Sequence, residues 1–309
     1  MLHRPARFTA LDAVLLCVLA GGAVLLAWRV YATQDYAWRW HVLAQYLLRF
    51  DEATGRWVPG LLARGLATTV RLSLWTMVLA TLLGGAMGLA RASGSLFWRL
   101  TGGAYVGLVR NVPPLVLIFI FYFFLSDMLL RALGVDAAVR ALPGWAREAL
   151  AWAMAPADQL PNFLAALMTM AVYEGAYIAE HVRAGVQSVE RGQREAARAL
   201  GFPPWQQMRL VVLPQAVARI VPPLAGQFIA TIKDTAIVSV ISVQELTFQG
   251  LELMAATYMT YEIMISVTVL YLLLTLTCSA LARRLELRLR RAWEPPAAPG
   301  PVDLAPGGR

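Results

Sequence analysis

Apolar and polar stretches alternate along this chain in a pattern that predicts several membrane-crossing helices. A helix needs about 20 consecutive apolar residues to cross a bilayer. Six runs come close to or exceed that length, at residues 12–32, 65–90, 112–130, 163–182, 218–242 and 260–282. The predicted fold class is therefore an all-α polytopic membrane protein with about six transmembrane helices.

Composition supports a membrane protein and argues against a soluble one. The chain is 59% hydrophobic and only 15% charged, and a soluble domain of 309 residues would carry more charge on its surface. The net charge is +8, and nearly all of the basic residues are arginines. These arginines lie between the apolar runs and not along one soluble face, so we do not expect a nucleic-acid partner.

The distribution of charge predicts the orientation in the membrane. Residues 183–219 hold six arginines against two glutamates, and residues 283–291 hold five more arginines. The segment 243–259 holds two glutamates and no basic residue. Because cytoplasmic loops of membrane proteins are enriched in basic residues, we expect both arginine-rich segments and both termini to be cytoplasmic.

Three regions are expected along the chain. Residues 1–62 form an N-terminal transmembrane anchor and a periplasmic segment, residues 63–292 the main transmembrane domain, and residues 293–309 a disordered Pro/Ala/Gly-rich tail. The first apolar run follows basic residues and ends near Val30-Tyr31-Ala32, so it fits either a signal peptide or a retained helix. We favour the retained helix.

A hydrophilic segment between the fourth and fifth apolar runs predicts two short helices. Residues 190–200 are strong helix formers, and Gly201 stands where a left-handed residue ends a helix. Pro203 prevents continuation, Pro204 suits the first position of a second helix, and Pro214 is expected to interrupt it. The first helix has a shallow apolar face and a charged rim, formed by Ala196, Ala197, Leu200, Arg191, Arg194, Glu195 and Arg198.

The same segment carries a family resemblance. It reads Glu195-Ala196-Ala197, three residues, Gly201, nine residues, Val211, one residue and Leu213-Pro214. With the flanking stretches 173–188 and 232–241, this resembles the polar amino acid uptake family of bacterial ABC-importer permeases, over about residues 60–290. The chain departs from the family pattern at Val211, where Ile is commoner, and at residues 110–115, where Arg-Asn-Val-Pro-Pro-Leu replaces Arg-Gly-Thr-Pro-Leu-Leu.

The resemblance implies a type I ABC importer permease core in the bacterial inner membrane, preceded here by one extra helix. Segment 183–219 would be the cytoplasmic loop that contacts a separate ABC ATPase dimer. The partners implied are that dimer, a second permease subunit, identical or paralogous, and a periplasmic amino-acid-binding protein. The residues expected to couple to the ATPase are Arg194, Glu195, Ala196, Ala197, Arg198, Leu200, Gly201 and Pro203.

No motif for catalysis or for a bound cofactor is found. A phosphate-binding loop needs Gly-Lys before Ser or Thr, but Lys233, the only lysine, lies between Ile232 and Asp234. The chain therefore cannot bind ATP in that way, and its energy must come from a partner. The two cysteines lie in apolar runs and the three histidines are scattered, so we expect no metal, no cofactor and no catalytic residue.

Ionisable residues inside the apolar runs are the candidate transport residues. Each costs about 2.5–3.5 kcal/mol at mid-bilayer, so each needs a partner or a cavity. Lys233 and Asp234 are neighbours on one helix and cannot face each other, so Glu174 or Glu180 is the expected partner of Lys233. One interpretation is a path for a zwitterion, lined by Glu174, Tyr177, Lys233, Asp234 and Thr235.

Two other interpretations stay open for these charges. They could form a structural ion pair between packed helices, and Glu180 with Arg183 fits that role. Alternatively, the chain could be a stand-alone secondary transporter or channel that uses Glu174, Lys233 and Asp234 as a relay. In the second run, Gly84, Gly85 and Gly88 predict close packing against another helix or, less simply, a hinge.

Overall fold

The computed structural model describes residues 9–33, 36–53 and 55–293, and these are mostly helical. The chain divides into two compact units, residues 1–42 and 43–309. The predicted tail lies outside the described residues except for Trp293. Each unit is described by itself.

The first unit is built on one apolar helix. Helix α1 (Ala10–Thr33) begins with a reciprocal cap, in which Thr9 N donates to Asp12 Oδ2 at 2.8 Å and Asp12 N donates to Thr9 Oγ1 at 3.3 Å. Leucines and valines are exposed along α1, as in a helix that faces lipid. The first apolar run is thus a helix, and it is followed by the short 3-10 turn η1 (Trp40–Val42).

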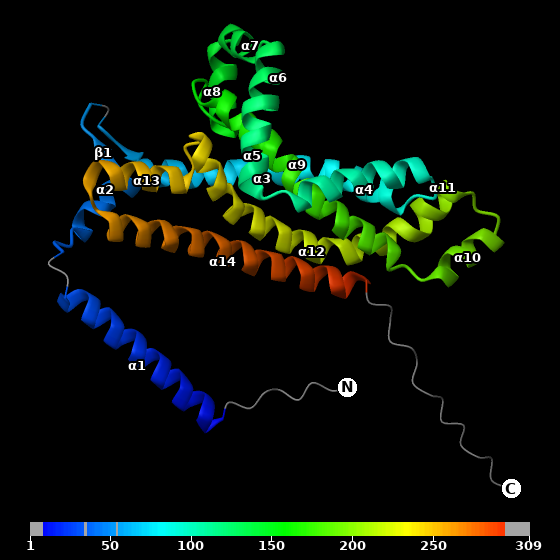
Figure 1. The fold of residues 1–309 in the computed structure, drawn as a ribbon, viewed down its shortest axis with the longest axis horizontal. Coiled ribbons are helices and arrows are strands. Elements are labelled where there is room, and N and C mark those ends of the chain that lie inside the picture. Colours follow the sequence, from blue (N-terminus) through cyan, green and yellow to red (C-terminus); the bar gives the residue numbers. More distant parts are fainter. Residues whose placement is uncertain (1–8, 34–35, 54, 294–309) are drawn as a thin grey trace. The chain divides into compact units, whose positions relative to one another are not determined.

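The second unit starts with a small hairpin and continues into long helices. Helix α2 (Leu43–Leu47) leads into strands β1 (Leu48–Asp51) and β2 (Arg56–Pro59), which pair antiparallel with Leu48 opposite Pro59. The long helices that follow are α3 (Leu61–Ala92), α9 (Leu160–Gln187), α12 (Leu213–Asp234) and α14 (Thr260–Trp293). Helices α3 and α9 are the most closely packed pair, α12 packs against α3, α9 and α14, and all four are visible in Figure 1.

Shorter helices connect the long ones. Between α3 and α9 lie α4 (Leu96–Asn111), α5 (Pro114–Ile120), the π-helix η2 (Phe121–Ser126), α6 (Asp127–Ala132), α7 (Val135–Ala141) and α8 (Gly144–Ala153). Between α9 and α12 lie α10 (Arg191–Ala199), α11 (Pro204–Gln206) and the π-helix η3 (Gln207–Val212). After α12 come the 3-10 helix η4 (Thr235–Ile241) and α13 (Leu246–Thr257).

The described helices include three that are each long and apolar enough to cross a membrane: 61–92, 204–241 and 260–288. A fourth candidate is the pair 96–111 and 114–130, bent by 111°. Helix α9 has comparable length, but Glu174 and Glu180 make it more polar. All six predicted runs are therefore helical, and three of the described helices, or four if the bent pair forms one span, are long and apolar enough to cross a membrane.

Helices also form in segments that connect the predicted apolar runs. Residues 96–111 form α4, and the segment 243–259 contains α13. Pro143 separates α7 from α8. Periodic apolar residues too few to span a bilayer still form helices when they pack against longer ones.

Pro214 does not interrupt its helix, contrary to expectation. The chain runs without a break from Pro204 through η3 into α12. A proline removes one N–H and crowds the preceding turn, and the wider π-turn at 207–212 directly before it makes room. Helix α11 and the fifth apolar run are therefore parts of one continuous helical element.

Two of the three glycines of α3 that were predicted to allow close packing do so. A Cβ on Gly84 would lie 2.5 Å from the carbonyl oxygen of Gly175, and one on Gly88 would lie 2.6 Å from Cβ of Val182. Gly85 has nothing within 4 Å of the corresponding position. The close contact between α3 and α9 therefore depends on Gly84 and Gly88.

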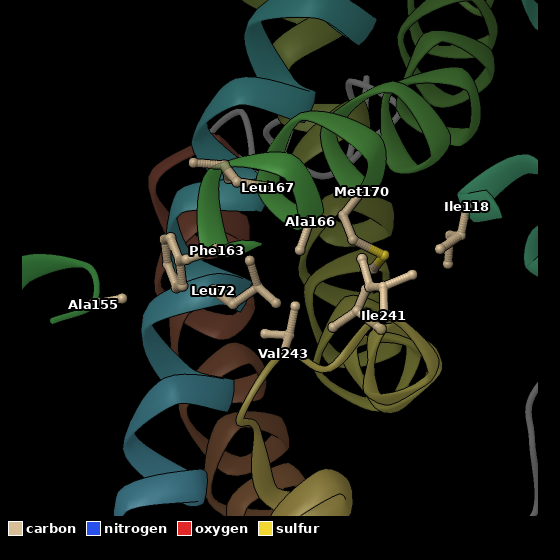
Figure 2. Packing of buried hydrophobic residues seen from close by; sticks show 10 residues of the cluster. Leu72, Ile118, Ala155, Phe163, Ala166, Leu167, Met170, Ile241 and Val243 are labelled. Carbon is tan, nitrogen blue, oxygen red and sulfur yellow. The ribbon is translucent and has the colours of Figure 1, made fainter. Parts of the chain in front are cut away.

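Apolar clusters follow α9 from one end to the other. Near its start, Phe163, Ala166, Leu167 and Met170 pack with Leu72 of α3 and with Ile241 and Val243, as Figure 2 shows. We call this group the Phe163 cluster; it also includes Ile118, Ala155 and Val238. Near the end of α9, Ile178, Val182 and Val186 pack against Ala80 and against Ala216 and Ile220 of α12. Polar side chains occupy the stretch between these two clusters.

Candidate functional site

The hairpin α10–α11 lies at one end of the long helices, far along the bundle from β1 and α2 (Figure 1). Gly201 has φ +80°. The N–H of Gly201 donates to the Arg198 carbonyl at 2.9 Å, and the N–H of Phe202 donates to the Ala197 carbonyl at 3.1 Å. This pair of bonds is a Schellman motif, so the predicted helix stop at Gly201 is confirmed.

Side-chain bonds fix the hairpin to the rest of the chain. Arg194 donates to the Val186 carbonyl at 2.6 Å, and Arg219 donates to the Ser188 carbonyl. Gln207 closes the turn by donating to the Phe202 carbonyl at 2.7 Å. The hairpin is therefore held by its own chain at both ends.

One of the hairpin residues expected to couple to the ATPase is not exposed. Ala197 is buried against the chain itself, with 3% of its surface exposed, because it faces the same way as Arg194. Glu195, Ala196 and Arg198 are exposed, and Leu200 is 76% exposed. Trp205, which was not among the expected contact residues, is 58% exposed beneath the guanidinium of Arg209. A surface with exposed Leu and Trp side chains and a charged rim is suited to a protein partner.

A buried polar network joins α9 to α12 in the middle of the bundle. The Glu174 side chain is fully buried, and Gln227 Nε2 donates to its Oε2 at 2.6 Å. Nε2 of His181 lies 3.3 Å from Oε1 of the same Gln227 amide. Thr231 and Asp234 interact with the same Glu174 carboxyl group. Oε1 of Glu174 has no hydrogen-bond partner among the described residues.

This network favours a cation. Two carboxyl groups, those of Glu174 and Asp234, lie together with no described basic side chain paired to Glu174. A buried carboxylate needs a positive partner, and an ammonium group can accept that role while donating three hydrogen bonds. We call Glu174, Gln227, Thr231, Asp234 and His181 the Glu174 network.

The predicted path residues are only partly brought together. Tyr177 lies one turn along from Tyr173, with their hydroxyl oxygens 3.4 Å apart. Lys233 is exposed and pairs with neither glutamate, so the expected ion pair is wrong for the described residues. Thr235 is buried, and its hydroxyl donates to the Ile232 carbonyl of its own helix at 2.7 Å. The α-helix changes to a 3-10 helix between Asp234 and Thr235.

Glu180 binds arginines instead of Lys233. It forms ion pairs with Arg91 of α3 and Arg183 of its own helix, and Arg110 of α4 lies 4.0 Å away. The guanidinium of Arg110 also lies 5.0 Å from the centre of the Tyr177 ring. The structural role expected for Glu180 with Arg183 is confirmed and extends to two more helices.

Gln227, Thr231 and His181 were missed in the sequence. Their signal is the spacing of polar residues within apolar helices: Gln227, Thr231 and Asp234 at i, i+4 and i+7, and Glu174 and His181 at i and i+7. Such spacings place side chains on one helix face. Two polar faces on successive membrane helices predict a shared network. A prediction based on charge alone selects Lys233 instead.

Comparison with known proteins decides the family. The family described as "Binding-protein-dependent transport system inner membrane component" matches residues 80–291, more than half of the chain. The chain belongs to this family. It is a permease subunit of an ABC importer, and the predicted fold class is confirmed.

Proteins similar to this permease subunit agree with the family assignment. The glutamine transport system permease protein GlnP of Escherichia coli K12 is 36% identical over 225 residues, which cover 71% of the chain and 90% of the relative. The glutamate/aspartate import permease protein GltJ of the same strain is 28% identical over 256 residues, covering 82% of the chain and 95% of the relative. A crystal structure of an amino acid ABC transporter with histidines superposes with a TM-score of 0.62 at 28% identity, covering 82% of this chain and all of that one.

Proposed function

We propose that this permease subunit carries polar amino acids across the bacterial inner membrane by alternating access. A separate ATPase dimer supplies the energy, a second permease subunit completes the path, and a periplasmic binding protein delivers the substrate. The arginine-rich end with α10 and both termini face the cytoplasm, because basic residues concentrate there. The relatives are named as amino acid permeases, which supports amino acids as the transported substrate.

The hairpin α10–α11 is the observation that carries this proposal. It is rigid, tied at both ends, and exposes Leu200, Glu195 and Trp205 at the bundle's end. A rigid protrusion transmits a movement of the ATPase without absorbing it. In this proposal Arg194, Ala197, Gly201 and Pro203 shape the hairpin, while Glu195, Ala196, Arg198 and Leu200 contact the ATPase.

The Glu174 network is the proposed substrate path. The ammonium group of an amino acid would supply a positive partner for the two carboxyl groups, and Tyr177 of α9 and Thr235 of η4 are assigned to the same path. Lys233 is exposed, unlike Glu174, so its place in the path is different. An ionisable side chain exposed on a membrane helix faces a water-filled cavity or a protein partner, so Lys233 would face the space between two permease subunits.

Replacing Glu195 tests the coupling. We expect Glu195→Lys to prevent co-purification of the ATPase with the permease, because it reverses a charge at the centre of the exposed rim. The control is Glu252→Lys, on α13 and far from the hairpin, which should leave the complex intact. Normal recovery of the ATPase with Glu195→Lys would contradict the assignment.

Replacing Lys233 tests its place in the path. Because Lys233 makes no ion pair with a described residue, Lys233→Ala should leave the assembled importer at its normal yield while lowering amino acid uptake several-fold. Val240→Ala, at another exposed position of the same helical element, is the matched control. Loss of the folded subunit with Lys233→Ala would show a structural role instead.

The alternative function is a stand-alone transporter or channel, and proteoliposomes separate it from an importer. Uptake that needs ATPase, binding protein and ATP supports the proposal. Uptake by the purified chain alone, driven by an ion gradient, would overturn it.

A further inference from the structure

A polar cavity of about 250 Å³ lies where α9 begins and η4 ends. The chain segments around it come from α3, from the turn before α9, from the loop after η4 and from α13. Its lining is rich in amide, hydroxyl and carboxyl groups: Thr68, Asp158, Gln159, Asn162, Ser242 and Gln244. Ala155, Phe163, Val243 and Phe248 complete the lining. We call it the Asn162 cavity.

The Asn162 cavity is separate from the Glu174 network. Phe163 and Val243 belong both to its lining and to the Phe163 cluster, whose packing Figure 2 shows. Along α9 the order is Asn162, then the apolar cluster, then Glu174. The apolar side chains of the cluster therefore lie between the two polar sites along α9.

The amide groups of the cavity are oriented as donors. Tyr122 donates its hydroxyl proton to Oδ1 of Asn162 at 3.2 Å, and Gln249 donates to Oε1 of Gln244 at 3.4 Å. Both acceptor oxygens are thus engaged, which leaves the two NH₂ groups without a bond to a described residue. The positive end of the long helix α9 begins beside them at Leu160. Two free amide donors next to a helix start are suited to a carboxylate.

Asp158 supplies a negative charge at the Asn162 cavity. Its carboxylate is exposed at the cavity and forms no ion pair with a described residue. Ser242 adds a hydroxyl although its φ of +59° would suit glycine better. The cavity thus offers a partner for an ammonium group and donors for a carboxylate, and its volume exceeds that of one amino acid.

We propose that the Asn162 cavity is an entry subsite that binds one free zwitterionic α-amino acid before it reaches the Glu174 network. The inference rests on the proposed function, in which this end of the bundle faces the periplasm. Asp158 holds the ammonium group, and the amides of Asn162 and Gln244 hold the carboxylate. Movement of the Phe163 cluster then admits the substrate to the interior.

Binding of radiolabelled L-glutamine to the purified permease–ATPase complex in lipid nanodiscs, without binding protein, tests this subsite. Asn162→Asp keeps the size of the side chain and an acceptor for Tyr122, but it places a second carboxylate against the ligand's own. We expect it to raise the half-saturating glutamine concentration at least about tenfold, the effect of losing one good polar contact. Asp158→Asn should weaken binding similarly, and Glu148→Gln, another exposed carboxylate of the same connecting region, should not.

The outcomes separate this inference from the proposed function. If the wild-type importer takes up no amino acid with its binding protein, the proposed function fails. If it takes up amino acids, but both cavity variants bind free glutamine like the wild type, only the entry subsite is overturned. If the variants change the response to binding-protein concentration and leave free glutamine binding intact, the cavity receives a segment of that protein, and the assignment to an amino acid is wrong. Normal assembly with the ATPase shows that each variant is folded.

Discussion

Alanine at position 84 should destabilise the subunit, whereas alanine at position 85 should not. A Cβ on Gly84 would lie 2.5 Å from the backbone oxygen of Gly175 and 2.7 Å from Cβ of Ile178. Backbone atoms of a packed helix cannot move aside alone, so α3 and α9 would have to separate. Overpacking of this kind costs roughly 1–3 kcal/mol in the free energy of unfolding. We expect the upper part of that range, because this helix pair has the largest contact in the bundle.

Gly85 is the matched control on the same turn of the same helix. Nothing lies within 4 Å of its Cβ position, and alanine is a better helix former than glycine by up to about 1 kcal/mol. The two substitutions are therefore expected to change the unfolding free energy in opposite directions. Thermal unfolding of the detergent-solubilised subunit measures both. Equal melting temperatures for Gly84→Ala and Gly85→Ala would contradict the packing described here.

Alanine at Gly201 should uncouple transport from ATP hydrolysis while leaving the membrane core folded. Gly201 has φ +80°, and a residue with a Cβ pays about 1–2 kcal/mol in that left-handed conformation. Nothing lies within 4 Å of its Cβ position, so the cost comes from the backbone alone. The Schellman bonds of Gly201 and Phe202 would weaken, and α10 would lose its fixed angle to α11.

Gly192 provides the comparison for this substitution. It lies in the first turn of α10 with ordinary helical backbone and open space around its Cβ position. Gly192→Ala should therefore keep the ATPase activity of the reconstituted importer coupled to amino acid uptake. Gly201→Ala should lower the number of amino acids taken up per ATP hydrolysed at least several-fold. An unchanged ratio for Gly201→Ala would show that the angle of the hairpin is unimportant for coupling.

The long helices and the hairpin could be predicted because their signals are local. Apolar runs near 20 residues and a Gly-Phe-Pro-Pro sequence after a run of helix formers each specify a structure without knowledge of the neighbours. Close packing of this glycine-rich stretch against another helix was predicted, but only the structure identifies α9 as that helix and separates Gly84 and Gly88 from Gly85. That distinction depends on the rotation of α3 about its axis, which a short glycine-rich stretch does not fix.

The partners of the buried charges could not be predicted in the same way. Glu174 and Glu180 were the predicted partners of Lys233 because all three are charged, yet Glu174 accepts a hydrogen bond from the neutral Gln227. The helix rotates Gln227, Thr231 and Asp234 toward α9 and leaves Lys233 outside. The continuous path through Pro214 was missed for a related reason. Whether proline ends a helix depends on the width of the preceding turn, and the π-turn of η3 is not visible in the residue types.

The continuous helical element from Pro204 to Ile241 connects the hairpin to the Glu174 network. About 29 residues separate Trp205 from Asp234, roughly 43 Å of helix at 1.5 Å per residue. In the proposed mechanism, a rotation of this helix at Trp205 would change the direction in which the carboxyl group of Asp234 points. Contact with the ATPase at one end of the helix would thereby change the ligands that the Glu174 network offers to the substrate.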